Sequence, residues 1–389
     1  MSTRPLKTGW KMVKFGEVVK NVNLVERDPK LNGIERIVGL EHLDPENLHI
    51  RRWNSVEQST SFTRKFLLGQ TLFGKRRAYQ RKVAYAEFDG ICSGDILTFE
   101  SRNKNVLLPE LLPFICQSEA FFDYALGTSA GSLSPRTSWT ALRDFEFPLP
   151  PIDEQKRIAE ILWAADEAVE KWMRVYSVLN VMLSVYRVEF FSRRNWQKKK
   201  LKDLFSVQLG KMLSPKAKMG KSSFPYLANY NVQWDHIDLA KVQEMSFSER
   251  EREKFALAAG DILVCEGGEV GRCAIWNEDI QNCYYQKALH RLRPISNFSS
   301  EVMLQFMMLA DRKGLFKAHT GHSTIAHLTA IKLKEMDVPV PSEAEQNFVA
   351  LFFREMKSAK HMILEQIVKT TELKQSLSYG LLTNGVPHV

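Results

Sequence analysis

Residues 153–172 of the chain read DEQKRIAEILWAADEAVEKW, and residues 342–360 read SEAEQNFVALFFREMKSAK. Each stretch directly follows a proline-rich boundary. A shift of 191 residues places the two stretches on each other, with Gln155 on Gln346. Both stretches open with polar residues and continue with apolar residues at helical spacing, so the chain contains the same helix-forming segment twice.

The blocks that precede the two helices repeat as well. The same shift places the segment GQTLF, which begins at Gly69, on GDILV, which begins at Gly260. Near the block starts the shift falls to 186, where Trp10 matches Trp196. Two copies of a block followed by a helix therefore fill nearly all of the 389 residues. We expect the boundaries 1–152 (first block), 153–194 (first helix), 195–341 (second block) and 342–389 (second helix).

Both helices carry an apolar seam with heptad spacing. The first seam alternates steps of four and three: Ile158, Leu162, Ala165, Val169, Trp172, Tyr176, Leu179, Leu183, Tyr186 and Phe190. The second is Val349, Phe353, Met356, Ile363, Ile367, Leu377 and Leu381, and Lys360, Thr370 and Lys374 interrupt it. Such seams are typical of helices that pack on helices, although each helix could pack only on its own block. A two-fold axis relating the copies reverses helix direction, so we expect an antiparallel coiled coil.

The blocks themselves combine strands and helices. Short β-like runs bounded by Gly, Asp or Asn occur at 36–40, 94–99 and 262–265. Apolar residues fall at helical spacing in 109–124 and 301–316. The expected fold class is α+β: two tandem mixed α/β domains and two long helices, with pseudo-two-fold symmetry.

The positive charge of the chain is concentrated in the two blocks. The first block has 21 Lys and Arg against 17 Asp and Glu, and the second has 21 against 16. Each helical segment is neutral, with 7 against 7 and 5 against 5. This division is typical of a protein that holds a polyanion at two places.

Equipment for catalysis is missing from the sequence. There is no Asn/Asp-Pro-Pro-Tyr/Phe motif for amino methylation, and no His/Cys cluster has zinc spacing. The segment Gly220-Lys221-Ser222 resembles the end of a phosphate-binding loop, but Pro215 stands where that loop needs glycine. Five cysteines without a C-x-x-C pair are typical of buried reduced thiols. We therefore expect no catalytic residue and no metal site.

Candidate DNA contacts in the first block form a basic segment and a small polar loop. The segment 74–82 reads GKRRAYQRK and the loop 128–136 reads TSAGSLSPR. Arginine and lysine suit phosphate contacts, and a bidentate arginine also reads guanine. The alternative for the segment is a solvated basic hairpin. The candidate residues are Lys75, Arg76, Arg77, Tyr79, Arg81, Lys82, Ser132 and Arg136.

In the second block the candidates are amides, a glycine-rich turn and the repeat of the polar loop. Asn229 and Asn231 carry amides of the kind that read adenine. The turn EGGEVGR presents Glu269 and Arg272, although its glycines could serve tight turns alone. The polar loop contains His322 and Ser323, and the shift of 191 residues matches Ser323 with Ser132.

These features resemble the specificity (S) subunits of type I restriction-modification systems. The phrase PLPPIDEQKRIA at 148–159 resembles the segment that opens a long helix in that family. The phrase GDILVCEGGEVGR at 260–272 resembles a recurrent segment of its target recognition domains, and 69–99 resembles a variant of it. The second helix departs from the family pattern, because Ser342 and Ala344 replace the proline-rich form.

The resemblance implies that each block reads one half of a split, asymmetric DNA site and that the helices set the gap. It implies double-stranded DNA, two methyltransferase (M) subunits and restriction (R) subunits as partners. S-adenosylmethionine, ATP and Mg would belong to those subunits, so no cofactor is expected in this chain. We expect a cytoplasmic location and no membrane span. The alternative is a solitary S-like DNA-binding protein, or a coiled-coil adaptor without restriction partners.

Overall fold

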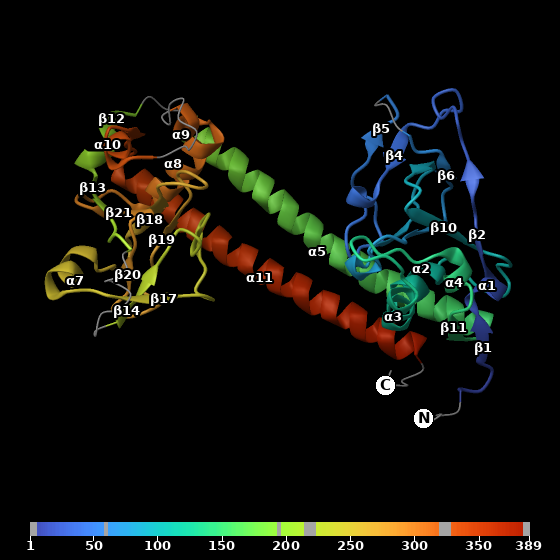
Figure 1. Ribbon diagram of the computed structural model, residues 1–389. Helices are drawn as coiled ribbons and strands as arrows, with labels where there is room; N and C mark the ends of the chain where they lie inside the picture. The colour runs from blue at the N-terminus through green and yellow to red at the C-terminus, as the bar shows by residue number, and fades with distance from the viewer. Residues whose placement is uncertain (1–5, 58–60, 193–195, 214–222, 319–327, 384–389) are drawn as a thin grey trace. The chain divides into compact units, whose positions relative to one another are not determined.

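The structure is a computed structural model and describes residues 6–57, 61–192, 196–213, 223–318 and 328–383 (Figure 1). The chain forms two compact units. The first unit contains residues 1–173 and 365–389, and the second contains residues 174–364. Each unit therefore holds one mixed block and a segment of each long helix.

The two long helices are α5, Ile152–Ser192, and α11, Glu343–Leu382 (Figure 1). Inside the second unit, Tyr176 lies beside Lys360 and Tyr186 lies beside Phe352, with 4.5 Å between the last two ring centroids. Residue numbers rise along α5 as they fall along α11, so the helices are antiparallel there. The predicted helix-on-helix packing is confirmed.

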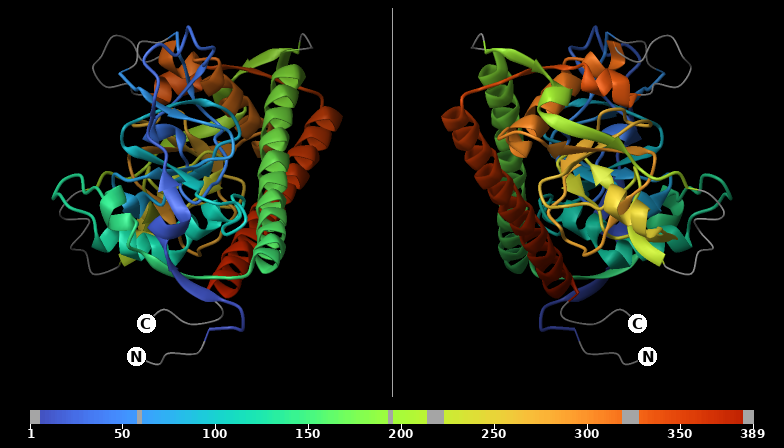
Figure 2. Two further views of the ribbon diagram at one scale, coloured as in Figure 1. Left: turned by 90° about the vertical axis from the view of Figure 1, so that its right-hand side faces the viewer. Right: turned by 90° about the vertical axis from the view of Figure 1, so that its left-hand side faces the viewer.

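Inside the first unit the same two helices share one core with the block. Ile158 and Leu162 of α5 belong to this core, and Leu377 and Leu381 of α11 pack against it. Figure 2 shows the first block lying to one side of α5 in this unit. The helix seam and the block core are therefore continuous, so the helix segments serve as part of the domain.

The first block is built from short strands around a four-stranded sheet with the order β2-β10-β7-β8. A second sheet has the order β3-β6-β9-β4-β5, and β1 pairs with β11 just before α5. The strands are β1 Lys11–Lys14, β2 Val19–Asn21, β3 Leu24–Val25, β4 Arg36–Val38, β5 Asn54–Ser55, β6 Arg64–Phe66, β7 Thr71–Gly74, β8 Val83–Tyr85, β9 Gly90–Cys92, β10 Ile96–Ser101 and β11 Glu146–Leu149. The helices are α1 Phe15–Val18, α2 Leu112–Gln117, α3 Glu119–Gly127 and α4 Trp139–Leu142, with 3-10 turns at Leu40–His42 and Ala78–Gln80.

The second block repeats this plan with a smaller second sheet. Its four-stranded sheet has the order β13-β21-β18-β19, its second sheet has the order β17-β14-β20, β15 pairs with β16, and β12 pairs with β22 before α11. The strands are β12 Lys198–Lys200, β13 Phe205–Leu209, β14 Ser223–Leu227, β15 Val232–Gln233, β16 His236–Ile237, β17 Gln243–Ser246, β18 Ile262–Cys265, β19 Cys273–Ile275, β20 Tyr284–Tyr285, β21 Leu289–Pro294 and β22 Asp337–Pro339. The helices are α7 Glu249–Phe255, α8 Ser300–Arg312, α9 Leu315–Ala318 and α10 Ala330–Lys334, with a 3-10 turn at Leu201–Asp203.

The expected α+β class is confirmed, but both helices predicted inside the blocks are broken. The helix predicted over 301–316 ends at Arg312, and α9 begins at Leu315 after a turn. The helix predicted over 109–124 is two helices, α2 and α3, that meet at Ser118. Ser118 has extended backbone angles, and its hydroxyl accepts a hydrogen bond from the backbone N–H of Phe121. Serine competes for backbone groups in this way and favours a cap over a helix interior.

A buried glutamine fixes the start of each long helix. The carboxamide of Gln155 accepts a hydrogen bond from Leu108 N and donates to the carbonyls of Val106 and Pro150, each at 2.8 Å. Gln346 repeats this in the second unit. It accepts from Ser299 N at 2.9 Å and donates to the carbonyl of Pro341 at 3.0 Å. Leu108 and Pro150 match Ser299 and Pro341 by the shift of 191 residues. Buried backbone groups need such partners, so the glutamine is a framework residue.

The lysine that interrupts the second seam has a partner. The ammonium group of Lys374 lies 2.5 Å from Asp166, and both side chains are buried. His49, in the loop after β4, contacts the other oxygen of Asp166 at 2.8 Å. A buried charge needs a partner of opposite charge, and a buried polar pair in a helix seam favours one register. Lys374 therefore supports the antiparallel register instead of weakening it.

All five cysteines are buried and unpaired. Within the described ranges, every helix is too short or too polar to cross a lipid bilayer.

Candidate nucleic-acid interface

Two segments predicted to contact DNA lie against each other in the first unit. We call residues 74–82 and 128–137 the paired loops. The backbone N–H of Arg77 donates to Pro135 O at 2.7 Å, and Thr137 N donates to Lys75 O at 3.0 Å. An isolated β-bridge joins Arg76 to Arg136. The loops are about 60 residues apart in the sequence, and backbone pairing turns them into one surface.

Both arginines of this bridge share one carboxylate. Asp95 accepts hydrogen bonds from Arg136 Nε at 2.9 Å and from Arg76 Nη1 at 3.5 Å. Arg76 Nε also donates to the hydroxyl of Ser134 at 2.6 Å. Burial acts to raise the pKa of Asp95, but the hydrogen bond and charge of Arg136 and the charge of Arg76 lower it overall. Asp95 thus orients two guanidinium groups and stays ionised.

Further cations surround this cluster. Lys75 is half-buried, and its pKa is lowered, first by burial and then by the positive charge of Arg64. The guanidinium of Arg64 donates to the backbone carbonyl of Ile96, next to Asp95. Lys75 also interacts electrostatically with Asp95 and Arg136, so the cluster holds more positive than negative groups. The paired loops therefore form a cationic surface to which an anion would bind favourably.

Arg77 and Tyr79 lie on the strained part of the paired loops. Arg77 has a φ of 54° and Arg81 a φ of 52°, on either side of the 3-10 turn. Left-handed backbone is uncommon for arginine and is found often at functional sites. The turn leaves the side chain of Tyr79 54% exposed. Its ring is thus available for contact with a ligand.

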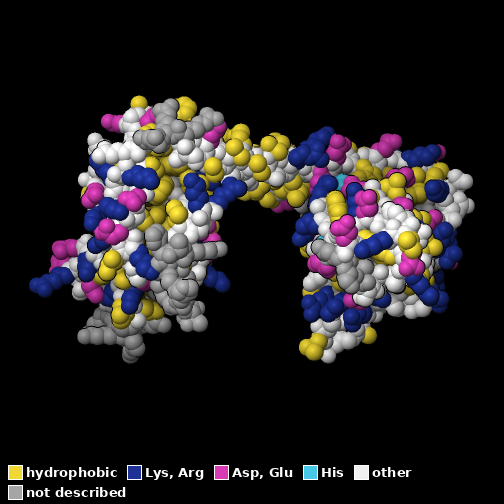
Figure 3. Space-filling view, turned by 90° about the horizontal axis from the view of Figure 1, so that it is seen from above, with side chains coloured by type: hydrophobic (Ala, Val, Ile, Leu, Met, Phe, Trp, Pro, Cys, Tyr) yellow, Lys and Arg dark blue, Asp and Glu magenta, His cyan; other side chains and the backbone are white. Residues whose placement is uncertain are grey.

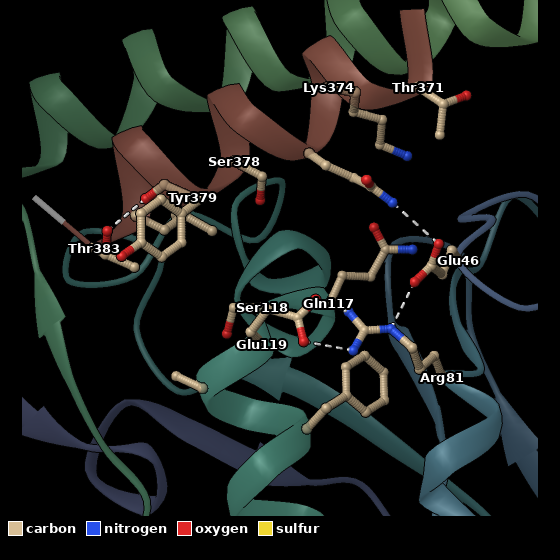
Figure 4. A pocket seen from close by; sticks show the side chains of 14 residues that line it. Glu46, Arg81, Gln117, Ser118, Glu119, Thr371, Lys374, Ser378, Tyr379 and Thr383 are labelled. Atoms are coloured by element: carbon tan, nitrogen blue, oxygen red, sulfur yellow. Dashed lines mark hydrogen bonds and ion pairs between the residues drawn. The ribbon is translucent and has the colours of Figure 1, made fainter. Parts of the chain in front are cut away.

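Two other predicted cations point inward. Arg81 forms ion pairs with Glu46 at 2.7 Å and Glu119 at 2.6 Å, and its guanidinium lies over the ring of Phe122. Figure 4 shows this arrangement in a cavity of about 90 Å³ between the first block and the last turns of α11. Lys82 Nζ donates to Leu40 O at 2.6 Å. These contacts favour structural roles for Arg81 and Lys82.

In the second unit a compact polar cluster occupies the glycine-rich turn. Arg272 donates to Glu269 at 3.1 Å and to the carbonyl of Asn229 at 2.9 Å. Glu269 also accepts from the indole of Trp234 at 2.6 Å. Gly268 and Gly271 have φ values of 75° and 86°, so both glycines serve the turn. Glu269 is half exposed and carries the polar face of the cluster toward solvent.

Asn231 has a different position. Its side chain is 1% exposed, accepts from Ala228 N, and donates to the carbonyls of Asp238 and Lys241. All of its hydrogen-bonding groups are thus used inside the protein, which favours a structural role. His42 has the same task in the first unit, because its ring accepts a hydrogen bond from the N–H of Gly39. The sequence offered no sign of this match between histidine and asparagine.

The remaining predicted residues lie at the two polar loops. Ser132 and Arg136 are exposed in the first unit. His322 and Ser323 lie outside the described residues. The residue after that loop is placed, however, and Leu328 N donates to Glu266 O at 2.9 Å. This bond matches the bond from Thr137 N to Lys75 O by the shift of 191 residues, so this one backbone contact of the interface occurs in both units.

Asp95, Arg64 and Ser134 were not among the predicted site residues. Asp95 follows a glycine just before β10, and nothing in its sequence neighbourhood indicates that Arg76 and Arg136 meet there. Only the pairing of β7 with β10 brings the carboxylate next to the basic segment.

Similarity to known proteins agrees with this architecture. The family model described as type I restriction modification DNA specificity domain matches residues 7–174 and again residues 193–376. The specificity subunit of the type I restriction enzyme EcoDI from Escherichia coli is 29% identical over 143 residues, which is 33% of this chain and 31% of that protein. The putative MjaX specificity subunit of Methanocaldococcus jannaschii is 22% identical over 219 residues, which is 53% of this chain and 51% of that protein. These alignments thus span about a third and about half of the relatives' lengths.

Solved structures share the fold over the full length. A chain from a type I R-M system, described for its complex assembly and conformational transition, covers 99% of this chain with a TM-score of 0.62 and 18% identity, and all of that chain is covered. The type I S subunit from M. genitalium covers 100% with a TM-score of 0.58 and 13% identity, and 99% of that chain is covered. Two copies of the family domain account for most of the sequence, and the chain belongs to the type I restriction-modification DNA specificity family.

Proposed function

We propose that the chain recognises a bipartite, asymmetric DNA sequence and does no chemistry on it. The observation that carries this proposal is the cationic surface of the paired loops, where Arg76 and Arg136 share the single carboxylate of Asp95. Oriented arginines next to exposed hydroxyl and aromatic groups suit phosphate contacts and base reading together. The set we propose for the first half-site is Lys75, Arg76, Arg77, Tyr79, Ser132 and Arg136.

The second half-site would be read by a different set on the same backbone frame. Glu269 and Arg272 are supported by their place on the glycine-rich turn, and Asn229 lies beside them. A carboxylate accepts from cytosine N4, whereas the first unit offers cations. Different side chains on a repeated frame would read different bases, so the complete site would be asymmetric.

Exposed apolar residues on the long helices support protein partners. Val175, Val178, Met182 and Val185 of α5 are between 45% and 62% exposed and follow steps of three, four and three. Figure 3 shows hydrophobic side chains gathered along this helix. Phe348, Leu351 and Met362 of α11 are also more than half exposed. A second heptad seam beside the one already buried suits helices of another chain.

We propose that methyltransferase subunits bind these seams and that restriction subunits join through them. Adenine methylation and ATP-dependent cleavage would then occur on those subunits, which would bind S-adenosylmethionine, ATP and Mg. The assembly would act on chromosomal and foreign DNA in the cytoplasm.

The proposal is tested by sequencing methylated adenine in a bacterial host that expresses the methyltransferase subunits with and without this chain. One split motif, methylated only when the chain is present, is the expected result. Inserting four residues into the 153–191 segment should change the gap of that motif or abolish methylation. Methylation that does not depend on the chain would contradict the proposal and favour the adaptor alternative.

The interface is tested by the salt dependence of binding. Arg76→Ala and Arg136→Ala should each weaken DNA binding and make the slope of log K against log salt shallower by roughly one. Arg81→Ala is the matched control, because its guanidinium is held by Glu46 and Glu119, and it should leave the slope unchanged. A slope that changes only in Arg81→Ala would overturn the assignment.

A further inference from the structure

One leucine of the paired loops is almost fully exposed to solvent. Leu133 is 91% exposed and lies at the tip of the 128–137 loop, between Ser132 and Ser134. A leucine held in water on a folded surface loses the burial that favours apolar side chains. Exposed single apolar residues are common, so the surroundings of Leu133 decide what it does.

The tip that carries Leu133 is fixed in place. Ala130 and Arg136 exchange two backbone hydrogen bonds of 3.0 Å, which close a short hairpin. The hydroxyls of Thr128 and Thr137 hydrogen-bond at 2.9 Å at its base. Ser134 accepts from Arg76, so the tip is also tied to the other paired loop. The leucine is therefore presented in advance, without the ordering that a free loop would need on binding.

The charges around the tip indicate the partner. Arg136 closes the hairpin, and Arg76 donates a hydrogen bond to Ser134, the residue after Leu133. Two cations therefore lie near the leucine. A polyanion with an apolar group between its charged edges fits this pattern. Duplex DNA has that group in the major groove, where thymine exposes its C5 methyl. The major groove, about 12 Å wide, admits a two-stranded β-ribbon, whereas the minor groove is about 6 Å wide.

We propose that Leu133 enters the major groove of the first half-site and contacts the C5 methyl of a thymine, while Arg76 and Arg136 contact the flanking phosphates. This inference rests on the proposed function, because it names one specificity determinant within the same interface. It adds apolar reading of a pyrimidine to the cations and polar groups of that surface.

The test replaces each thymine of the recognised site by deoxyuridine, which removes only the methyl group. The full chain, with its methyltransferase subunits if binding requires them, is measured by competition against the unmodified duplex. At one thymine, wild-type protein should lose affinity by about fourfold, the value of one buried methyl-sized contact. Leu133→Ala should lose about as much on the unmodified duplex and show no further loss at that position.

Matched variants separate this role from a structural one. Leu31→Ala removes another leucine of the first unit that is 86% exposed, and it should behave like wild type in every duplex. Leu133→Met keeps an apolar side chain of similar volume and should keep the sensitivity to deoxyuridine. Because Leu133 is exposed, Leu133→Ala should leave the thermal unfolding temperature unchanged.

The possible outcomes are distinct. The inference is overturned if Leu133→Ala remains as sensitive to every deoxyuridine as wild type, or if no thymine methyl affects wild-type binding. A different result would contradict the proposed function itself: wild-type protein that binds the recognised motif no more tightly than a random duplex.

Discussion

The two units share one framework but differ in the charges that join each block to its helices. Gln155 and Gln346 hold the helix starts through matching backbone groups. At another matching position, however, α5 carries Asp166 and α11 carries Lys357, with opposite charge. A glutamine that satisfies fixed backbone groups has little freedom to change, whereas an ion pair can reverse if both partners change.

The loop after the first parallel strand supplies the other half of each contact. In the first unit this loop brings His49 to Asp166. In the second unit it brings Asp235, whose carboxylate accepts from Lys357 at 2.6 Å. Glu46 and Asp235 both have a φ of 58° in this loop, which marks the shared path of the backbone. The repeat thus keeps the backbone geometry of this contact while its charges differ between the units.

The two contacts also differ in burial. The side chains of Asp166 and Lys374 are 4% and 11% exposed, whereas those of Lys357 and Asp235 are 48% and 24% exposed. Breaking a buried pair leaves a charge without solvent, but a surface pair contributes little.

Asp166→Asn should destabilise the first unit by about 3–5 kcal/mol, because the ammonium of Lys374 would remain buried without a counter-charge. Hydrogen exchange of the full chain should show the loss in β7 and β10 and leave β18 and β21 unchanged. The double variant Asp166→Asn with Lys374→Met removes both charges and should recover most of the loss. A double variant as unstable as the single one would show that the pair is not the cause.

Gln155→Ala should cost about 2–3 kcal/mol and Gln346→Ala about 1–2 kcal/mol, because the first glutamine makes three hydrogen bonds to backbone groups and the second makes two. Hydrogen exchange at the start of α5 and of α11 measures these two losses of stability through local unfolding. Equal effects in the two units would contradict this ranking.

The contribution of His49 should depend on pH. Its pKa is raised above the ordinary value, mainly by the hydrogen bond to Asp166, with burial opposing and Glu87 adding to the rise. Protonated His49 is thus favoured in the folded state. Its stabilisation is fully present below the unfolded pKa of about 6.5 and is lost as pH rises through the raised folded pKa. As pH rises above the unfolded pKa, the first unit should therefore lose stability relative to a His49→Gln variant, measured by the same hydrogen-exchange experiment. An identical pH profile in that variant would exclude His49.

Lys357→Gln should destabilise the second unit by less than about 1 kcal/mol, because the ammonium group is half exposed. The same hydrogen-exchange experiment measures it in β18 and β21. A loss as large as that of Asp166→Asn would mean that burial does not explain the difference between the units.

Much of this architecture could be predicted from the sequence because it follows from periodicity. The heptad seams and the repeat predicted both long helices and their antiparallel packing. Lys374 looks like an interruption in the sequence because its partner is not a seam residue. That partner, Asp166, lies next to the seam residue Ala165 on the other helix. The break at Ser118 was hidden because α2 and α3 have continuous apolar spacing.

The candidate site could be predicted only in parts. Each of the paired loops was predicted from its composition, but their contact depends on strand pairing between residues far apart in the sequence. The inward direction of Arg81 depends on Glu46 and Glu119, which lie in other elements. Asn231 looked like a base reader because burial cannot be read from residue type.

The division of each long helix between the two units has a consequence for synthesis on the ribosome. The first unit takes its first 173 residues from the start of the chain and its remaining residues from position 365 onward. Its core is incomplete until the second unit has been translated, because Lys374, the partner of Asp166, is made only after that unit. The block made first should therefore finish folding last, and a nascent chain stalled before residue 365 should display its unpaired helix to chaperones and proteases.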